Sequence, residues 1–113
     1  MQILQFIALV LGTLALAPGI AHVASFLTRI HLNESTYFIV QTVYRGWNLF
    51  GIVLVGALIA NVALAAAVRR HPQAFRLVLA NLLCLIGGLT IFFVFTYPAN
   101  VATNNWTAVP ANW

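Results

Sequence analysis

The chain has 113 residues, of which 63% are hydrophobic and 5% are charged. Soluble domains carry about 25% charged residues, so this composition excludes a water-soluble globule and indicates an integral membrane protein in a lipid bilayer, built as one domain over residues 1–113. The net charge of +4 comes from five arginines against one acid, Glu34. The arginines do not form the clustered basic face of a nucleic-acid-binding domain, which excludes nucleic acid as a partner.

The first apolar run covers about residues 3–27. At about 1.5 Å per residue it can cross a hydrocarbon core of about 30 Å. A secretory signal peptide is the competing interpretation, but Met1-Gln2 carries no Lys or Arg, and Pro18 would directly follow the cleavage box Ala15-Leu16-Ala17. The run is therefore predicted to be a retained helix that kinks or breaks near Pro18.

A polar turn over residues 32–36 separates this run from a second one, about residues 37–68. Asn33 or Ser35 can cap the second helix, and Glu34 suits the positive end of its dipole. The second run is longer than a bilayer requires, so its first turns are expected to lie at or above the membrane surface.

The second run, taken as one helix, has a polar face at its start and a small-residue face further along. The polar face comprises Gln41, Tyr44, Arg45 and Asn48, which follow the i, i+3, i+4 and i+7 pattern. The small-residue face comprises Ala60, Ala63 and Ala67 and predicts close packing against another helix.

A basic hairpin over residues 69–76 contains three of the five arginines, so the positive-inside rule makes it cytoplasmic. The third span covers about residues 76–97 and is expected to end at Pro98. Within it, Cys84 is expected to be a small buried hydrophobe.

These elements predict an all-α integral membrane protein, an antiparallel transmembrane helix bundle with three spans and an outer-face segment over residues 98–113. With the hairpin inside, the N-terminus is also cytoplasmic, and residues 28–36 and 98–113 lie on the outer side. Most of the polar and aromatic side chains then gather at that outer end. Any binding or catalytic site is expected there.

Arg45 is the first candidate for a catalytic residue, because a cation near a membrane surface must find a partner or reach water. It could clamp an anionic substrate, form an ion pair with Glu34, or anchor the helix at the interface beside Tyr44 and Trp47. The residue pattern leaves these three interpretations open.

His22 is the second catalytic candidate, as a general base or a ligand. It shares a polar edge with Ser25 and Arg29 at helical spacing, so it could equally be a polar residue facing the wet outer end. With a single acid and no Cys/His cluster, the sequence predicts no metal site and no cofactor.

The Asn- and Trp-rich segment after Pro98 could orient a substrate carbonyl or phenol by hydrogen bonds and stacking. Alternatively, its asparagines satisfy loop backbone groups while its tryptophans anchor at the headgroups. The candidate substrate- or partner-binding residues are Glu34, Trp47, Asn48, Tyr97, Asn100, Asn104 and Trp106.

Five short stretches together resemble the DUF1772 family: Ala21-His22, Thr36-Tyr37, Val43-Tyr44-Arg45-Gly46-Trp47, Tyr97-Pro98-Ala99-Asn100 and Asn105-Trp106-Thr107. The resemblance implies a small, mostly bacterial four-helix protein of the inner (cytoplasmic) membrane. The family includes anthrone oxygenase-like members, similar to cofactor-independent enzymes that oxidise an anthrone to an anthraquinone. This chain ends at Trp113, before the family's Trp-Glu and Arg-containing segment and its fourth helix, so it is expected to lack that C-terminal helix and the acid and His that an oxygenase would use.

Two functions are therefore carried forward. The first is an accessory or structural subunit that packs with other transmembrane subunits in a larger complex of the respiratory or photosynthetic type. The second is an anthrone oxygenase-like enzyme acting on a planar phenolic substrate at the outer face. In the second, His22 is the base, Arg45 stabilises the oxyanion, and aromatic and Asn side chains hold the ring.

Overall fold

The computed structural model describes residues 1–112, and all their regular structure is helical. The elements in order are α1 (Gln2–Arg29), α2 (Glu34–Gln41), η1 (Thr42–Tyr44), η2 (Trp47–Leu49), α3 (Phe50–Val68), α4 (Pro72–Ile91), η3 (Phe92–Thr96) and α5 (Tyr97–Ala102). Three segments are long and apolar enough to cross a membrane: Gln2–Arg29, Trp47–Val68 and Pro72–Ala102. The prediction of an all-α fold with three spans is confirmed.

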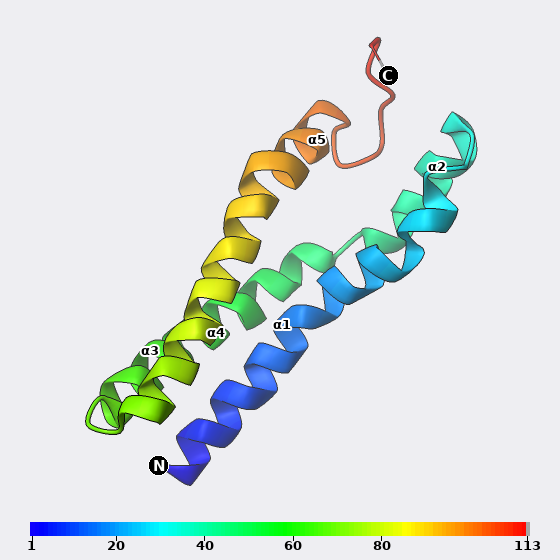
Figure 1. Ribbon diagram of the computed structural model, residues 1–113. Coiled ribbons are helices and arrows are strands. Elements are labelled where there is room, and N and C mark those ends of the chain that lie inside the picture. Colours follow the sequence, from blue (N-terminus) through cyan, green and yellow to red (C-terminus); the bar gives the residue numbers. More distant parts are fainter. Residues whose placement is uncertain (113) are drawn as a thin grey trace.

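The molecule is elongated, with extents of 55 × 22 × 20 Å. Helix α3 packs against both α1 and α4, while α1 and α4 diverge from each other (Figure 1). The chain start and the α3–α4 turn lie at one end, called here the hairpin end. Helices α2 and α5 lie at the other, called the α2/α5 end, which also carries residues 103–112 (Figure 1).

The core is small and lies near the hairpin end, where Ala8 of α1 meets Ala60, Leu64 and Val68 of α3. Small side chains at such a crossing let the two backbones approach closely. The predicted small-residue face is only partly correct, since Ala60 is buried but Ala63 and Ala67 are exposed. Because alanines lie on more than one side of this helix, its sequence did not specify which row would face α1.

The second apolar run is not one helix. Helix α2 ends at Gln41, and Gly46 adopts a left-handed conformation with φ of +84° before η2 and α3 begin. A glycine enters this region without the steric penalty of a side chain. Consequently Tyr44 and Arg45 do not continue a helical face from Gln41, and the expected polar face of a single helix does not form.

Both prolines within the apolar runs lie inside helical backbone. Helix α1 continues through Pro18 to Arg29. The third span continues through Pro98 to Ala102, contrary to the expected end at Pro98. A π-helical turn over Phe92–Thr96 precedes this proline, and such a widened turn accommodates a residue that lacks a backbone N–H.

The N-cap of α2 follows the sequence prediction. The Asn33 side-chain oxygen accepts the backbone N–H of Thr36 at 2.9 Å, and Glu34 lies in the first turn. This arrangement satisfies an otherwise unpaired N–H group and places an acid at the positive helix end. Cys84, in contrast, is exposed on α4 rather than buried.

Candidate functional site

The most connected polar group lies where the last turns of α1 meet the segment that follows α2. Its centre is Arg29, whose side chain is buried, with 8% of the residue exposed. The side chain runs back along α1, the usual direction for a helical residue. Its Nε donates to Ser25 Oγ at 3.0 Å, and its Nη2 donates to the carbonyl oxygen of His22 at 3.0 Å.

Arg29 also joins α1 to the two elements that follow. Its Nη1 donates to Gln41 Oε1 at 3.3 Å, and Gln41 Nε2 donates in turn to the Tyr37 hydroxyl at 3.2 Å. The guanidinium carbon lies 5.4 Å from the centre of the Tyr44 ring, within cation–π range. The arginine therefore holds α1, α2 and η1 together.

His22 contacts the same guanidinium and two aromatic rings. Its Nδ1 lies 3.3 Å from Arg29 Nη2. Because a guanidinium has no acceptor, Nδ1 must accept in this contact, and a neutral ring then carries its proton on Nε2. The imidazole lies 4.4 Å from the Tyr44 ring centre and 5.6 Å, edge-on, from that of Trp47.

The charge of Arg29 is met by neutral groups. Its hydrogen-bond partners are a hydroxyl, a carboxamide, a backbone carbonyl and an imidazole nitrogen. The single acid, Glu34, is exposed on α2 and stands outside this network. A cation held in this way, beside aromatic faces, is suited to stabilising a partly negative oxygen. Because the guanidinium is buried, its main role in this structure is to hold the helices together by these hydrogen bonds.

The structure brings together some of the predicted residues and separates others. The Arg29 cluster is the group formed by His22, Ser25, Arg29, Gln41, Tyr44 and Trp47. It includes the predicted residues His22 and Trp47, whereas Arg45 and Asn48 are exposed outside it. The helical spacing of His22, Ser25 and Arg29 predicted their shared edge, and the structure confirms that Arg29 contacts His22. The cation beside His22 is therefore Arg29 and not Arg45, the predicted oxyanion-stabilising residue.

The second predicted group lies in the loop after α5. The Trp106 indole donates from Nε1 to Asn100 Oδ1 at 2.8 Å. Its backbone N–H donates to the hydroxyl of the buried Thr103 at 3.1 Å. Asn104, Asn105 and Trp106 have φ of 48°, 55° and 65°, a run of three left-handed residues. Asparagine tolerates this conformation better than most side chains, which accounts for the Asn-rich composition.

This loop crosses from the third span to α2. The Trp106 ring centre lies 5.7 Å from that of Tyr37 and 5.7 Å from that of Phe38. Tyr37 also accepts the hydrogen bond from Gln41, so the Trp106 loop and the Arg29 cluster are linked. Tyr97 instead contacts Phe92 and Phe93 on its own span.

A pair of asparagines inside the spans is hydrogen-bonded between α3 and α4, which the sequence analysis did not predict. Asn81 of α4 donates from Nδ2 to Asn61 Oδ1 of α3 at 2.9 Å, and the buried Asn61 donates to the Ala57 carbonyl oxygen at 2.8 Å. Both asparagines face a groove of about 260 Å³ whose lining also includes Gly12 of α1 and Leu77 of α4. The signal that could have identified this pair was an Asn within each of the second and third apolar runs.

Within residues 1–112, no group of three or more His, Cys, Asp or Glu side chains could hold a metal ion. Fold and site together define a small α-helical protein with three helical segments long and apolar enough to cross a membrane, and a buried arginine beside aromatic rings at one end. No family model matches the chain, and comparison with curated proteins and with solved structures finds no match either.

Proposed function

We propose that this protein is an accessory subunit that packs with another transmembrane subunit in a larger membrane complex. The observation that carries the proposal is Asn81, an exposed carboxamide on α4 beside the groove between α1 and α4. It lies nine positions after Pro72, about 13 Å along the helix axis and so near the middle of a hydrocarbon core of about 30 Å.

A partner helix would satisfy the exposed part of this amide. Asn81 Nδ2 already donates to Asn61, and among residues 1–112 no hydrogen bond to Asn81 Oδ1 is present. In hydrocarbon no water can supply the missing donor. Asn side chains bridge packed transmembrane helices, and Gly12 on the facing wall leaves room for close approach. The partner is therefore a transmembrane helix with a side-chain N–H or O–H donor.

Site-specific photocrosslinking in native membranes tests this proposal. A photoreactive residue replaces Leu77, which lines the groove, or Leu83, which is similarly exposed on α4 but does not line it. A discrete crosslinked product is expected from position 77, and its yield should fall when Asn81 is changed to Leu. Equal products from both positions, or a crosslink indifferent to Asn81→Leu, would refute the proposed interface.

The location and orientation belong to the same proposal. The protein lies in a bacterial inner membrane, with the N-terminus and loop 69–76 in the cytoplasm and residues 28–36 and 98–113 on the outer side. Three arginines at the hairpin end support this orientation by the positive-inside rule, and the DUF1772 resemblance supports the bacterial assignment. A topology reporter fused before Met1 that is found on the outer side of the membrane would contradict this orientation.

The second candidate is the oxygenase-like enzyme, favoured by the His22–Tyr44–Trp47 ring cluster beside Arg29. The reaction balances as anthrone plus O₂ giving anthraquinone plus water. With Nδ1 accepting from Arg29, His22 offers a donor at Nε2 rather than a base, so in this geometry it would hydrogen-bond the substrate oxygen. Absence of anthrone turnover by the folded wild-type protein would exclude this function, and turnover that survives His22→Ala in folded protein would exclude the role of His22.

A further inference from the structure

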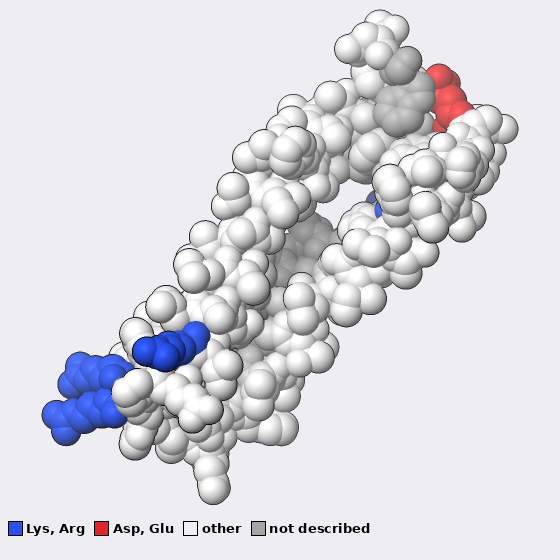
Figure 2. Space-filling model, viewed as in Figure 1, with Lys and Arg blue, Asp and Glu red and all other residues white. Residues whose placement is uncertain are grey.

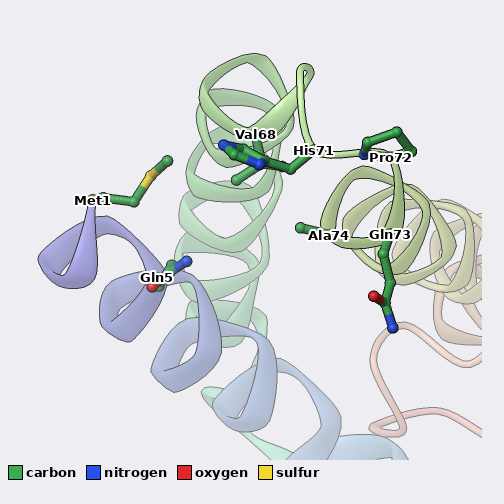
Figure 3. A pocket seen from close by; sticks show the side chains of 7 residues that line it. All are labelled: Met1, Gln5, Val68, His71, Pro72, Gln73 and Ala74. Carbon is green, nitrogen blue, oxygen red and sulfur yellow. The ribbon is translucent and has the colours of Figure 1, made fainter.

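A second feature lies at the hairpin end, opposite the end that carries the buried Arg29, and has a different lining from the groove of the partner-helix proposal. A pocket of about 520 Å³ opens at the hairpin end, between the first turns of α1 and α4 (Figure 3). Gln5 lines it from α1, His71 from the α3–α4 turn, and Gln73 and Ala74 from α4. The His71 ring extends from the turn toward the α1 side, where Gln5 lies (Figure 3).

The surroundings of this pocket are strongly basic. Arg69, Arg70 and Arg76 are all exposed within eight residues of sequence. Figure 2 shows their basic side chains gathered at the hairpin end, with the acidic residue, Glu34, at the other end. The molecule is 55 Å long, and charges interact over about 8 Å at physiological salt. Glu34 therefore cannot neutralise the hairpin end.

The depth of the pocket in the membrane follows from the spans. Helix α3 ends at Val68 and α4 begins at Pro72, so the turn between them marks a membrane–water boundary. Lipid phosphates lie at this level, and juxtamembrane arginines attract anionic lipids. The volume falls within the range of about 300–1,000 Å³ of pockets that hold small molecules.

We propose that this pocket binds the phosphate headgroup of an anionic phospholipid from the adjoining leaflet. The three arginines supply the attraction, while Gln5, His71 and Gln73 provide N–H donors for the phosphate oxygens. A zwitterionic lipid carries the same phosphate, but its cationic group would meet the arginines. The site therefore discriminates by net headgroup charge.

The charge requirement is tested by native mass spectrometry of the protein in micelles that contain equal phosphatidylglycerol and phosphatidylcholine. Preferential retention of phosphatidylglycerol is expected. Arg69→Gln, Arg70→Gln or Arg76→Gln should each weaken it about fivefold. The matched control is Arg45→Gln, which removes one exposed arginine from the other end and should change nothing. Equal losses from Arg45→Gln and Arg76→Gln would overturn the proposal, since net charge alone would then explain binding.

A second pair of variants separates a pocket from a diffuse basic surface. Gln5→Leu and Gln2→Leu each remove one amide from the start of α1 without changing charge, but only Gln5 lines the pocket. Loss of a hydrogen bond to a charged group predicts about tenfold weaker phosphatidylglycerol binding for Gln5→Leu and no change for Gln2→Leu. Identical behaviour of the two variants would refute the pocket.

Competition distinguishes a lipid from a free anion. Excess inorganic phosphate, added at constant ionic strength, should leave phosphatidylglycerol bound, because the lipid is also held by its acyl chains. Displacement by phosphate but not by equal chloride would show a soluble-anion site and overturn the lipid assignment. Circular dichroism of each variant confirms that helix content is unchanged, which the exposure of the altered residues predicts.

Discussion

Replacing Arg29 is predicted to lower the stability of the protein. In Arg29→Met the apolar stem remains, and the guanidinium with its four hydrogen bonds is lost. Ser25 Oγ retains its bond to the Ala21 carbonyl oxygen at 2.8 Å. As acceptors, Ser25 Oγ keeps the Tyr44 hydroxyl at 3.3 Å and the His22 carbonyl oxygen keeps the Ser25 hydroxyl at 3.4 Å. Gln41 Oε1 and His22 Nδ1 lose the donor that they accept from here. An unsatisfied buried acceptor costs about 1–3 kcal/mol. Gln41 is buried and His22 is half-buried, so the free energy of unfolding should fall by about 1–4 kcal/mol.

The desolvation cost of the buried cation acts in the opposite direction and favours the lower part of this range. Arg29→Lys separates charge from geometry, because a lysine retains the charge but not the planar fork that reaches three partners. It should lose most of the same stability. A value for Arg29→Lys close to wild type would show that charge alone matters.

The assay is reversible unfolding in mixed detergent micelles of rising SDS fraction, followed by far-ultraviolet circular dichroism. The matched control is Arg45→Met, at an exposed arginine outside the cluster, which should shift the free energy of unfolding by no more than about 0.5 kcal/mol. Indistinguishable shifts for Arg29→Met and Arg45→Met would show that the hydrogen bonds around Arg29 do not hold the helices together.

Two further predictions use the same assay, and a third uses limited proteolysis. A double-mutant cycle with Leu at Asn61 and Asn81 should give a coupling free energy of about 0.6 kcal/mol and at most about 1.7 kcal/mol, and strict additivity would argue against their hydrogen bond. Gly46→Ala should lower the free energy of unfolding by about 1–2 kcal/mol, because the φ of Gly46 is +84°. The control is Gly51→Ala, which should be neutral or stabilising because its added Cβ would meet nothing within 4 Å. The reverse order of the two variants would refute the left-handed turn. Asn100→Ala should make the loop after α5 more sensitive to protease, because the indole N–H at 2.8 Å loses its acceptor, and unchanged cleavage would contradict that anchoring role.

Much of the fold was predictable because its causes are local. Apolar length alone predicts three spans, since each requires about 20 residues to cross a bilayer. The cap at Asn33 was predictable for the same reason, because its acceptor serves a backbone N–H only three residues away.

The second span shows where local signals failed. Residues 37–68 read as one apolar run, and hydropathy does not distinguish a continuous helix from one interrupted by a turn. The break at Gly46 is made by a single residue in a left-handed conformation, and Tyr44 and Trp47 on either side of it contact His22 on α1. Those contacts join residues more than twenty positions apart.

The candidate site divides in the same way. Composition and spacing alone determined that His22, Trp47 and Trp106 belong to the polar, aromatic end of a membrane protein. Helical spacing placed Arg29 on one edge with His22, but only the tertiary structure decided that Arg29 is the buried cation, that Arg45 stays exposed, and that Trp106 reaches α2. The physical reason is that a bilayer acts on each segment separately and selects helices by length and polarity. Which charged side chain becomes buried depends on donors and acceptors that several helices supply together.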